Sequence, residues 1–356
     1  EYTVRRNGRS WSVEIPVMTA DQQTATASAV APKAASPPQA SQESKTECPV
    51  ESDRYEGFAP VYKGRNICVF ESEKWPGVSV LRLASFAYRN IPESEANATL
   101  RKEVSAFYEG YWKAKAPSVK KLIIDVLDNG GGDTPVAWYE ILLDKPFQEQ
   151  GVEFKKLPEL ENADIRRDMF YDDLGKEIWF TRLKEAGRYA KIKVGAFLPA
   201  IPQFCATEDK SCEVGLYQPL EHGFKGEIRI LVNEWCISSC TGFVWQLKDK
   251  LGSRVKLVGM PDSGASAYAR LYLDLYLDPS KAEGYRLEVA GRRGRTKQEL
   301  PEGAVLRHQV AVTRSTDLRG RIVSAKPTRV DEWIPIHYRE FDDSWEAKAF
   351  KAALAK

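Results

Sequence analysis

The sequence predicts an α/β fold with a mainly parallel sheet, and two observations support this prediction. Apolar runs of strand length alternate with segments of helical periodicity along most of the 356 residues. Several of these runs are apolar without interruption, as expected of strands that are buried on both faces. Strands that alternate with helices typically form one parallel sheet with helices packed on it.

The strands of this sheet are predicted from four apolar runs: 78–86 (VSVLRLASF), 120–128 (KKLIIDVLD), 227–233 (EIRILVN) and 254–259 (RVKLVG). Helices are predicted over 93–115, 136–143 and 162–189, after the strand 227–233 to about residue 250, and at the C-terminus. In the first helix Leu100, Val104, Phe107 and Tyr111 share one face, and Pro117 ends it. Residues 259–336 alternate in the manner of further strands.

The chain is predicted to have three parts. Residues 1–18 alternate around Asn7-Gly8 and predict a hairpin, which is too small to be stable alone. Residues 19–47 are rich in Ala, Ser, Thr, Pro and Gln and predict a flexible linker. Residues 48–356 form the main body, with a loop-like stretch at 201–226.

Composition narrows the class of function. The chain is 43% hydrophobic and 29% charged, with a net charge of +2, so no global field attracts nucleic acid. No window approaches the ~20 apolar residues of a membrane span. The sequence offers no common zinc-ligand spacing, so we expect no metal and no cofactor.

Six cysteines fall in local pairs: Cys48 with Cys68, Cys205 with Cys212, and Cys236 with Cys240. Such pairs favour disulfides in an oxidising compartment, so we expect a periplasmic or secreted protein. The alternative is six buried thiols in a cytosolic protein.

The stretch "ILVNEWCISSCTGFVWQLKD" (230–249) places Ser238 and Ser239 between a buried strand and a helix. Such a turn pushes a side chain outward, and the free N–H groups of the helix start can stabilise an oxyanion. The other role for these serines is to cap the helix, which is the commoner role for serine at this position.

A second strand ends in "DVLDNGGGD" (125–133), where three glycines let the backbone approach another group closely. The glycines could supply a second oxyanion donor, or they could form a plain tight turn. A glycine-rich strand end and a serine-bearing strand end on one sheet together favour a catalytic site.

Four blocks, in order, resemble the tail-specific or C-terminal-processing proteases, the S41 serine peptidases. "LIIDVLDNGGG" resembles their "LILDLRNNGGG", and "ILVNEWCISSCTG" is similar to "VLVNxxSASASE". "VKLVGMPDSGAS" and "HQVAVTRSTDLRGRIVSAKPTRVDEWIP" resemble two later blocks more loosely. The opening hairpin resembles the last strands of a PDZ-like domain, and residues 150–222 have no counterpart and are taken as an insertion.

The resemblance implies a ClpP/crotonase-like core, preceded by a remnant of a PDZ-like domain. It implies that Ser238 is the nucleophile, and that the N–H of Ser239 and of Gly130 or Gly131 form the oxyanion hole.

The general base is not identified. The family's usual lysine is missing from the corresponding "PDSGASAY" loop (261–268). Lys248, Lys256 and Asp249 are expected to be solvated surface residues. The other candidates are the only three histidines of the chain, and a structural or surface role is expected for each: His222, His308 and His337.

A disulfide between Cys236 and Cys240 would clamp the turn around Ser238. If it were reduced, Cys240 at the helix start would have a lowered pKa and could be a nucleophile instead.

The sequence therefore favours a serine endopeptidase that acts on polypeptides through Ser238. The alternative is an inactive relative that binds peptides as a scaffold, because the usual lysine is absent. The oligomeric state is not predicted.

Overall fold

The computed structural model describes two segments near the N-terminus and most of the chain after residue 53. The described residues are 2–6, 9–13, 54–88, 91, 93–133, 135–148, 151–170, 173–202, 216–220, 223–264, 270–282, 284–290, 302–317, 321–323, 326–335 and 344–355. The chain divides into two units, Glu1–Lys45 and Thr46–Lys356.

In the first unit, strands β1 (Tyr2–Arg6) and β2 (Arg9–Val13) pair in antiparallel fashion, with Arg6 opposite Arg9. The predicted hairpin is therefore confirmed. Its assignment to a PDZ-like domain stays a prediction, and the predicted linker 19–47 lies outside the described residues.

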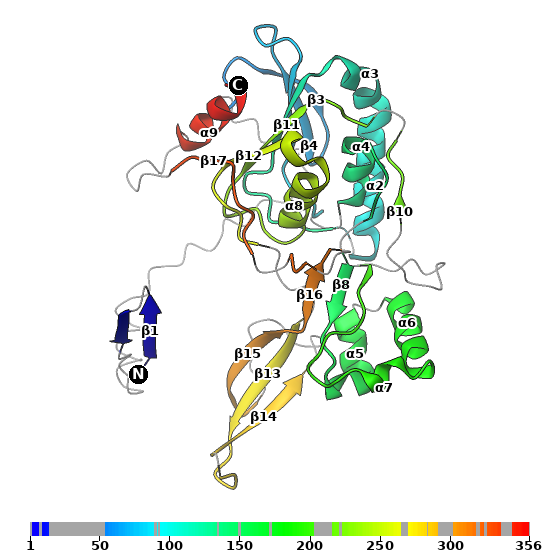
Figure 1. The fold of residues 1–356 in the computed structure, drawn as a ribbon, viewed down its shortest axis with the longest axis vertical. Coiled ribbons are helices and arrows are strands. Elements are labelled where there is room, and N and C mark those ends of the chain that lie inside the picture. The colour runs from blue at the N-terminus through cyan, green and yellow to red at the C-terminus, as the bar shows by residue number, and fades with distance from the viewer. Residues whose placement is uncertain are drawn as a thin grey trace. The chain divides into compact units, whose positions relative to one another are not determined.

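The second unit is built on a seven-stranded sheet with the order β17-β12-β11-β6-β5-β4-β3 (Figure 1). The five strands from β17 to β5 run parallel, and β4 and β3 add antiparallel edge strands. This confirms the predicted α/β fold. The strands are β3 (Ala59–Lys63), β4 (Ile67–Glu71), β5 (Val78–Leu83), β6 (Lys121–Asp125), β11 (Glu227–Val232), β12 (Val255–Gly259) and β17 (Glu332–Trp333).

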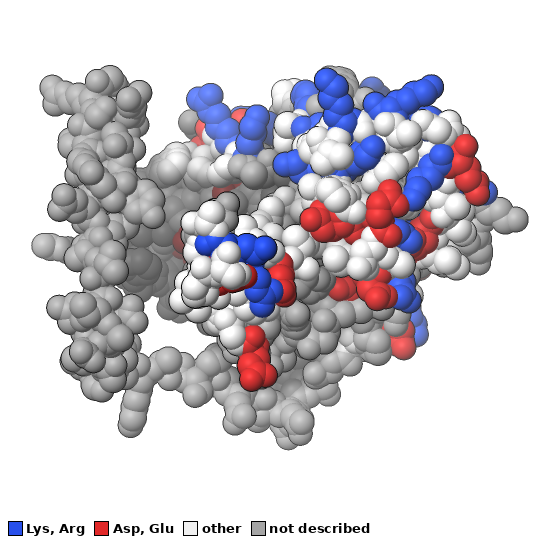
Figure 2. Space-filling model, turned by 90° about the horizontal axis from the view of Figure 1, so that it is seen from below, with Lys and Arg blue, Asp and Glu red and all other residues white. Residues whose placement is uncertain are grey.

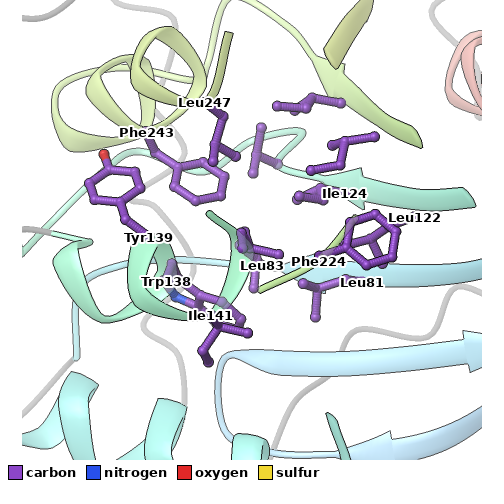
Figure 3. Close-up of a cluster of buried hydrophobic side chains, with 14 of the residues drawn as sticks. Leu81, Leu83, Leu122, Ile124, Trp138, Tyr139, Ile141, Phe224, Phe243 and Leu247 are labelled. Atoms are coloured by element: carbon purple, nitrogen blue, oxygen red, sulfur yellow. The ribbon is translucent and has the colours of Figure 1, made fainter. Parts of the chain in front are cut away.

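Both faces of this sheet are buried, as the uninterrupted apolar runs predict. On β6, Leu122 and Ile124 enter one core cluster, whereas Ile123 enters the cluster on the opposite face. The first face is covered by α2 (Glu93–Phe107), α4 (Val136–Leu142) and α8 (Ser239–Leu251), and the second by α9 (Ser344–Leu354). Figure 3 shows how side chains of α4 and α8 lie over the first face, among them Trp138, Phe243 and Leu247.

The first helix departs from the predicted single helix over 93–115. It passes into a π-helical turn, η1 (Tyr108–Trp112), and then into α3 (Lys113–Lys115) and η2 (Ala116–Ser118). Pro117 lies in η2 and ends the helical segment, as predicted. Trp112 is fully buried against the core, which accounts for the local change of helical pitch.

The predicted insertion and the late strands form a separate buried cluster. Phe154, Phe170 and Phe180 lie in it together with Leu271 and Val312 from later strands. The elements of this part are β8 (Gly151–Phe154), η3 (Pro158–Glu161), α5 (Ala163–Phe170), α6 (Leu174–Glu185), α7 (Arg188–Lys191), β9 (Ile201–Pro202), β13 (Arg270–Leu277), β14 (Tyr285–Ala290), β15 (Ala304–Ala311) and β16 (Thr313–Thr316). Strands β7 (Phe147–Gln148) and β10 (Leu216–Tyr217) pair with each other against the first core cluster, and η4 (Gly252–Arg254) follows α8.

On the face shown in Figure 2, basic and acidic side chains lie next to one another, in keeping with a net charge of only +2. Among the described residues, no helix has the length and apolar character that a membrane crossing requires.

A buried carboxylate, Asp125, ends β6 below the glycine-rich turn. It pairs with Arg82 Nη1 at 2.7 Å and with Arg54 Nη1 at 3.2 Å. It also accepts hydrogen bonds from the Tyr55 hydroxyl and, at 2.8 Å, from the Leu127 amide. Both oxygens of this carboxylate therefore have charged or hydrogen-bonding partners.

Burial alone would raise the pKa of Asp125, but Arg82, Arg54 and the hydrogen bonds hold it below its ordinary value. The same arginines also bond other parts of the chain, so that these parts are linked to Asp125. Arg82 donates to the Leu127 carbonyl at 2.6 Å, and Arg54 pairs with Glu346 of α9. The network therefore fixes the end of β6, where the glycine-rich turn begins.

We predict that Asp125→Asn lowers the free energy of unfolding by about 3–5 kcal/mol, because it leaves the buried Arg82 without its counter-charge. The loss is expected at neutral pH and shrinks as the pH falls below about 4. The reason is that a carboxylate with a lowered pKa stabilises the fold above its unfolded pKa and stops doing so as it is protonated. Urea unfolding at several pH values measures this.

Asp164→Asn is the matched control, because Asp164 forms only an exposed pair with Arg167. Its expected cost is below about 1 kcal/mol. An equal cost for the two variants at neutral pH would contradict the role given to Asp125.

Candidate active site at two strand ends

Ser238 lies at the corner where β11 gives way to α8. Its backbone has φ 62° and ψ −125°, and its side chain makes no capping hydrogen bond to the helix. The interpretation of Ser238 as a helix cap is therefore wrong. A positive φ is costly for a residue with a Cβ, of order 1–3 kcal/mol, and such strain is typical of functional sites. The residue is half-buried.

The glycine corner that follows β6 packs directly against this serine. Gly131 has φ +82°, and a Cβ placed on it would lie 2.5 Å from the Ile237 carbonyl oxygen and 2.9 Å from Ser238 Cβ. A Cβ on Gly132 would lie 2.2 Å from the Ala87 amide nitrogen. Only glycine fits at these two positions: Gly131 allows the contact with the Ser238 corner, and Gly132 allows a close contact with the Phe86–Ala87 backbone after β5.

Hydrogen bonds join the same two corners. Asn233 and Asp128 bond reciprocally: the Asp128 amide donates to Asn233 Oδ1 at 3.1 Å, and Asn233 Nδ2 donates to Asp128 Oδ1 at 2.8 Å. The Ile237 amide donates to the Asn129 carbonyl at 3.4 Å. Asp128 also has a positive φ of 62°. Both strand ends are thus held in uncommon backbone conformations by bonds to each other.

The predicted oxyanion donors lie at this junction, but not all are free. The Gly131 amide donates to Asn129 Oδ1 at 2.9 Å. Among the described residues, the amides of Gly130 and Ser239 form no such bond. Ser239 is the first residue of α8, where backbone N–H groups lack helical partners, and its nitrogen lies 3.0 Å from the Cβ position of Gly131. The Ser239 hydroxyl donates to the Gly132 carbonyl at 3.1 Å.

A disulfide closes the serine corner. Cys236 and Cys240 are bonded, with Cα atoms 5.3 Å apart, and both are fully buried. This contradicts the interpretation of Cys240 as a free thiolate nucleophile. Cys68 is also disulfide-bonded. The other cysteines, Cys48, Cys205 and Cys212, lie outside the described residues, so their pairing stays a prediction.

The loop after β12, where the family's lysine would be expected, packs against the same corner. The Ser263 amide donates to the Cys236 carbonyl at 3.2 Å, and its hydroxyl donates to the Glu234 carbonyl. Asp262 is buried, which raises its pKa, and its Oδ1 accepts from the Gly264 and Thr328 amides. Residues 265–269 of the loop lie outside the described residues.

The described candidates for a general base are engaged or exposed elsewhere. Lys248 Nζ binds Asp331 at 2.7 Å, and Asp249 pairs with Arg321 at 2.6 Å. Lys256 is exposed on β12.

The described histidine, His308, is exposed on β15, whereas His222 and His337 lie outside the described residues. Within the described part of the chain, the Ser238 hydroxyl forms no hydrogen bond.

Two large apolar side chains beside the serine are exposed. Trp235 is 64% exposed and Ile237 is 37% exposed. Because the disulfide and the Asn233 side chain hold this turn, these side chains are presented on a fixed backbone.

The sequence profile of peptidase family S41 matches residues 77–291, which is more than half of the chain. The chain belongs to peptidase family S41. Both corners of the site lie inside the matched range.

Several solved structures resemble this S41 chain at low identity. A peptidase from Parabacteroides merdae, described as putative, is 13% identical, with a TM-score of 0.44; the match covers 82% of this chain and 65% of that one. Mature CPAF complexed with lactacystin is 13% identical, with a TM-score of 0.48 and coverage of 99% and 65%. The photosystem II D1 C-terminal processing protease is 14% identical, with a TM-score of 0.33 and coverage of 76% and 46%.

The chain thus spans less than two thirds of the length of these solved chains. At such TM-scores the family assignment depends on the sequence profile alone. A search of curated proteins gives no match.

Sequence reasoning singled out Ser238, Ser239 and the glycines, and the structure brings them together. It missed Asn233, whose side chain bonds the two corners to each other, and Asn129, whose side chain bonds Leu83 and Gly131 on the glycine side. The signal was present: Asn129 follows the predicted strand 120–128 and Asn233 ends the predicted strand 227–233, positions where a short amide side chain can bond backbone groups of a turn.

We predict that Gly131→Ala lowers the free energy of unfolding by at least about 2 kcal/mol, because the new Cβ meets Ile237 and the backbone has a positive φ. Gly130→Ala is the matched control, since a Cβ there meets nothing within 4 Å. Its expected change is below about 1 kcal/mol. Urea unfolding of both variants measures the difference, and equal stability of the two would contradict the packing of the corners.

Proposed function

We propose that this S41 chain is a serine peptidase that hydrolyses peptide bonds in polypeptide substrates through an acyl-enzyme on Ser238. The observation that supports the proposal is the contact between the glycine corner and the Ser238 corner. In this contact Gly131 lies against both Ser238 Cβ and the Ser239 amide at the start of α8, and a serine beside backbone N–H groups supports acyl transfer.

In the proposed reaction Ser238 Oγ attacks the peptide carbonyl carbon, and the carbonyl oxygen becomes an oxyanion. The amides of Ser239 and Gly130 would hold this oxyanion, because the Gly131 amide is bonded to Asn129. The hydroxyl proton passes to a base and then to the leaving amine, and water hydrolyses the acyl-enzyme. No described residue is assigned as that base.

We also propose a branch of the family and a cellular location for this chain. The sequence blocks favour the tail-specific or C-terminal-processing branch of the family. The Cys236–Cys240 disulfide favours a periplasmic or secreted location, because disulfides persist in oxidising compartments.

A second candidate is a peptide-binding scaffold that has lost catalysis. The observation that favours it is that the Ser238 hydroxyl has no hydrogen-bonded base among the described residues. Such a protein would bind peptides without reacting with a serine-directed probe.

We predict that a fluorophosphonate probe labels the wild type and Ser239→Ala but not Ser238→Ala, and that Ser238→Ala loses peptide hydrolysis. Ser239→Ala is the matched control, because it removes a neighbouring hydroxyl and keeps the backbone N–H. In-gel fluorescence and mass spectrometry measure the labelling. Absence of label on the wild type, with peptide binding intact, would favour the scaffold.

We predict that Trp235→Ala lowers kcat/KM about tenfold for peptides with a large apolar residue at the cleaved bond. This corresponds to a loss of about 1.4 kcal/mol of transition-state binding. The exposed Trp235 indole beside Ser238 can pack against a large apolar side chain of the substrate, but it makes little apolar contact with a small polar one. Glu234→Ala, at the neighbouring exposed position, is the control. Equal losses for apolar and polar substrates would argue against this contact.

A further inference from the structure

A cavity of about 600 Å³ lies on the outer side of α8, away from its N-terminal serine corner. It is formed between the C-terminal half of the helix and the segment that leads to β17. The lining residues are Trp245, Lys248, Ile322, Val323, Lys326, Pro327, Thr328, Arg329, Val330 and Asp331. Its volume is within the range of small-molecule sites, about 300–1,000 Å³.

The lining is mixed, with apolar side chains beside polar and charged ones. Trp245 is half-buried and provides the aromatic wall, and Ile322 is 44% exposed at the edge. Lys326 and Arg329 are both exposed at the cavity. An aromatic or branched apolar body would therefore contact Trp245 while its polar end reached the rim.

The charges of the rim are not balanced. Lys248 is neutralised by Asp331, with Nζ–Oδ distances of 2.9 and 2.7 Å, and it also donates to the Val255 carbonyl. Within the described ranges, Lys326 and Arg329 form no ion pair. Two positive charges, those of Lys326 and Arg329, thus lie at the cavity, while Asp331 in its lining is already paired with Lys248.

The acids near the cavity do not alter this balance. Arg321 lies over the Trp245 ring at 5.8 Å and pairs with both Asp249 and Asp317. Asp249 also pairs with Lys250 at 3.6 Å, so these two carboxylates face two basic groups. Asp262, which accepts from the amide of the lining residue Thr328, is buried, and burial raises its pKa. The surplus of positive charge remains with Lys326 and Arg329.

We propose that this cavity binds a small organic carboxylate with an aromatic or branched apolar body. The body packs against Trp245, Val323 and Val330, and the carboxylate pairs with Lys326 and Arg329. Guanidinium groups suit carboxylates because they can form two parallel hydrogen bonds. None of the lining residues belongs to the Ser238 corner, so the proposal does not depend on whether the chain cleaves peptides.

The test is a titration of the whole chain with 2-naphthoate, followed by tryptophan fluorescence and calorimetry, against the neutral 2-naphthalenemethanol. We expect saturable binding of the carboxylate, at least tenfold tighter than that of the alcohol, and weaker at high salt. Trp245→Phe should remove most of the fluorescence change and retain calorimetric binding.

The double variant Lys326→Ala/Arg329→Ala should weaken 2-naphthoate binding at least tenfold, whereas Lys74→Ala, at an exposed lysine on a distant turn, should leave it unchanged. Val323→Trp, which fills the cavity, should weaken both ligands. Circular dichroism checks that each variant is folded. The proposal is overturned by equal affinity for acid and alcohol, by no saturable binding of the acid, or by a double variant that binds as the wild type does.

Discussion

The close approach of Gly131 to the Ile237–Ser238 backbone is the constraint on which the site depends. Two neighbouring parallel strands, β6 and β11, end at the same edge of the sheet, but their following turns meet only because the first carries no Cβ. The contact is shorter than any side chain would permit. It places Ser238, the Ser239 amide and the glycine backbone in one small volume.

The surrounding structure offsets the strain that this contact requires. Asp128 and Ser238 have positive φ values, each of which costs of order 1–3 kcal/mol. The Asn233–Asp128 pair, the buried Asp125 network and the Cys236–Cys240 disulfide hold the two turns from three sides. Within these supports Ser238 is half-buried rather than fully packed into the core.

The sequence predicts the parallel strands and the helices on them well, because buried strands such as 120–128 are apolar on both faces. The prediction of one helix over 93–115 misses the π-turn at Tyr108–Trp112, since burial of Trp112 is a tertiary effect that periodicity does not report. The corner residues Ser238 and Gly131 are predictable because a strand end, a turn residue and a helix start are local signals.

The supports of the corner are harder to predict. Asp125 and Arg82 interrupt apolar strands, which marks them as unusual, but their pairing depends on strand order. Arg54 lies before any predicted element, so its contact with Asp125 is visible only in three dimensions. The same holds for the Lys326 and Arg329 rim, which depends on how the late segment folds over α8.

The most direct test of this account is the nuclear Overhauser effect between Gly131 Hα and Ser238 Hβ protons in a selectively labelled sample. The account predicts a clear cross-peak, because the Cβ position of Gly131 lies 2.9 Å from Ser238 Cβ. Assigned resonances for both residues without any cross-peak between them would contradict it.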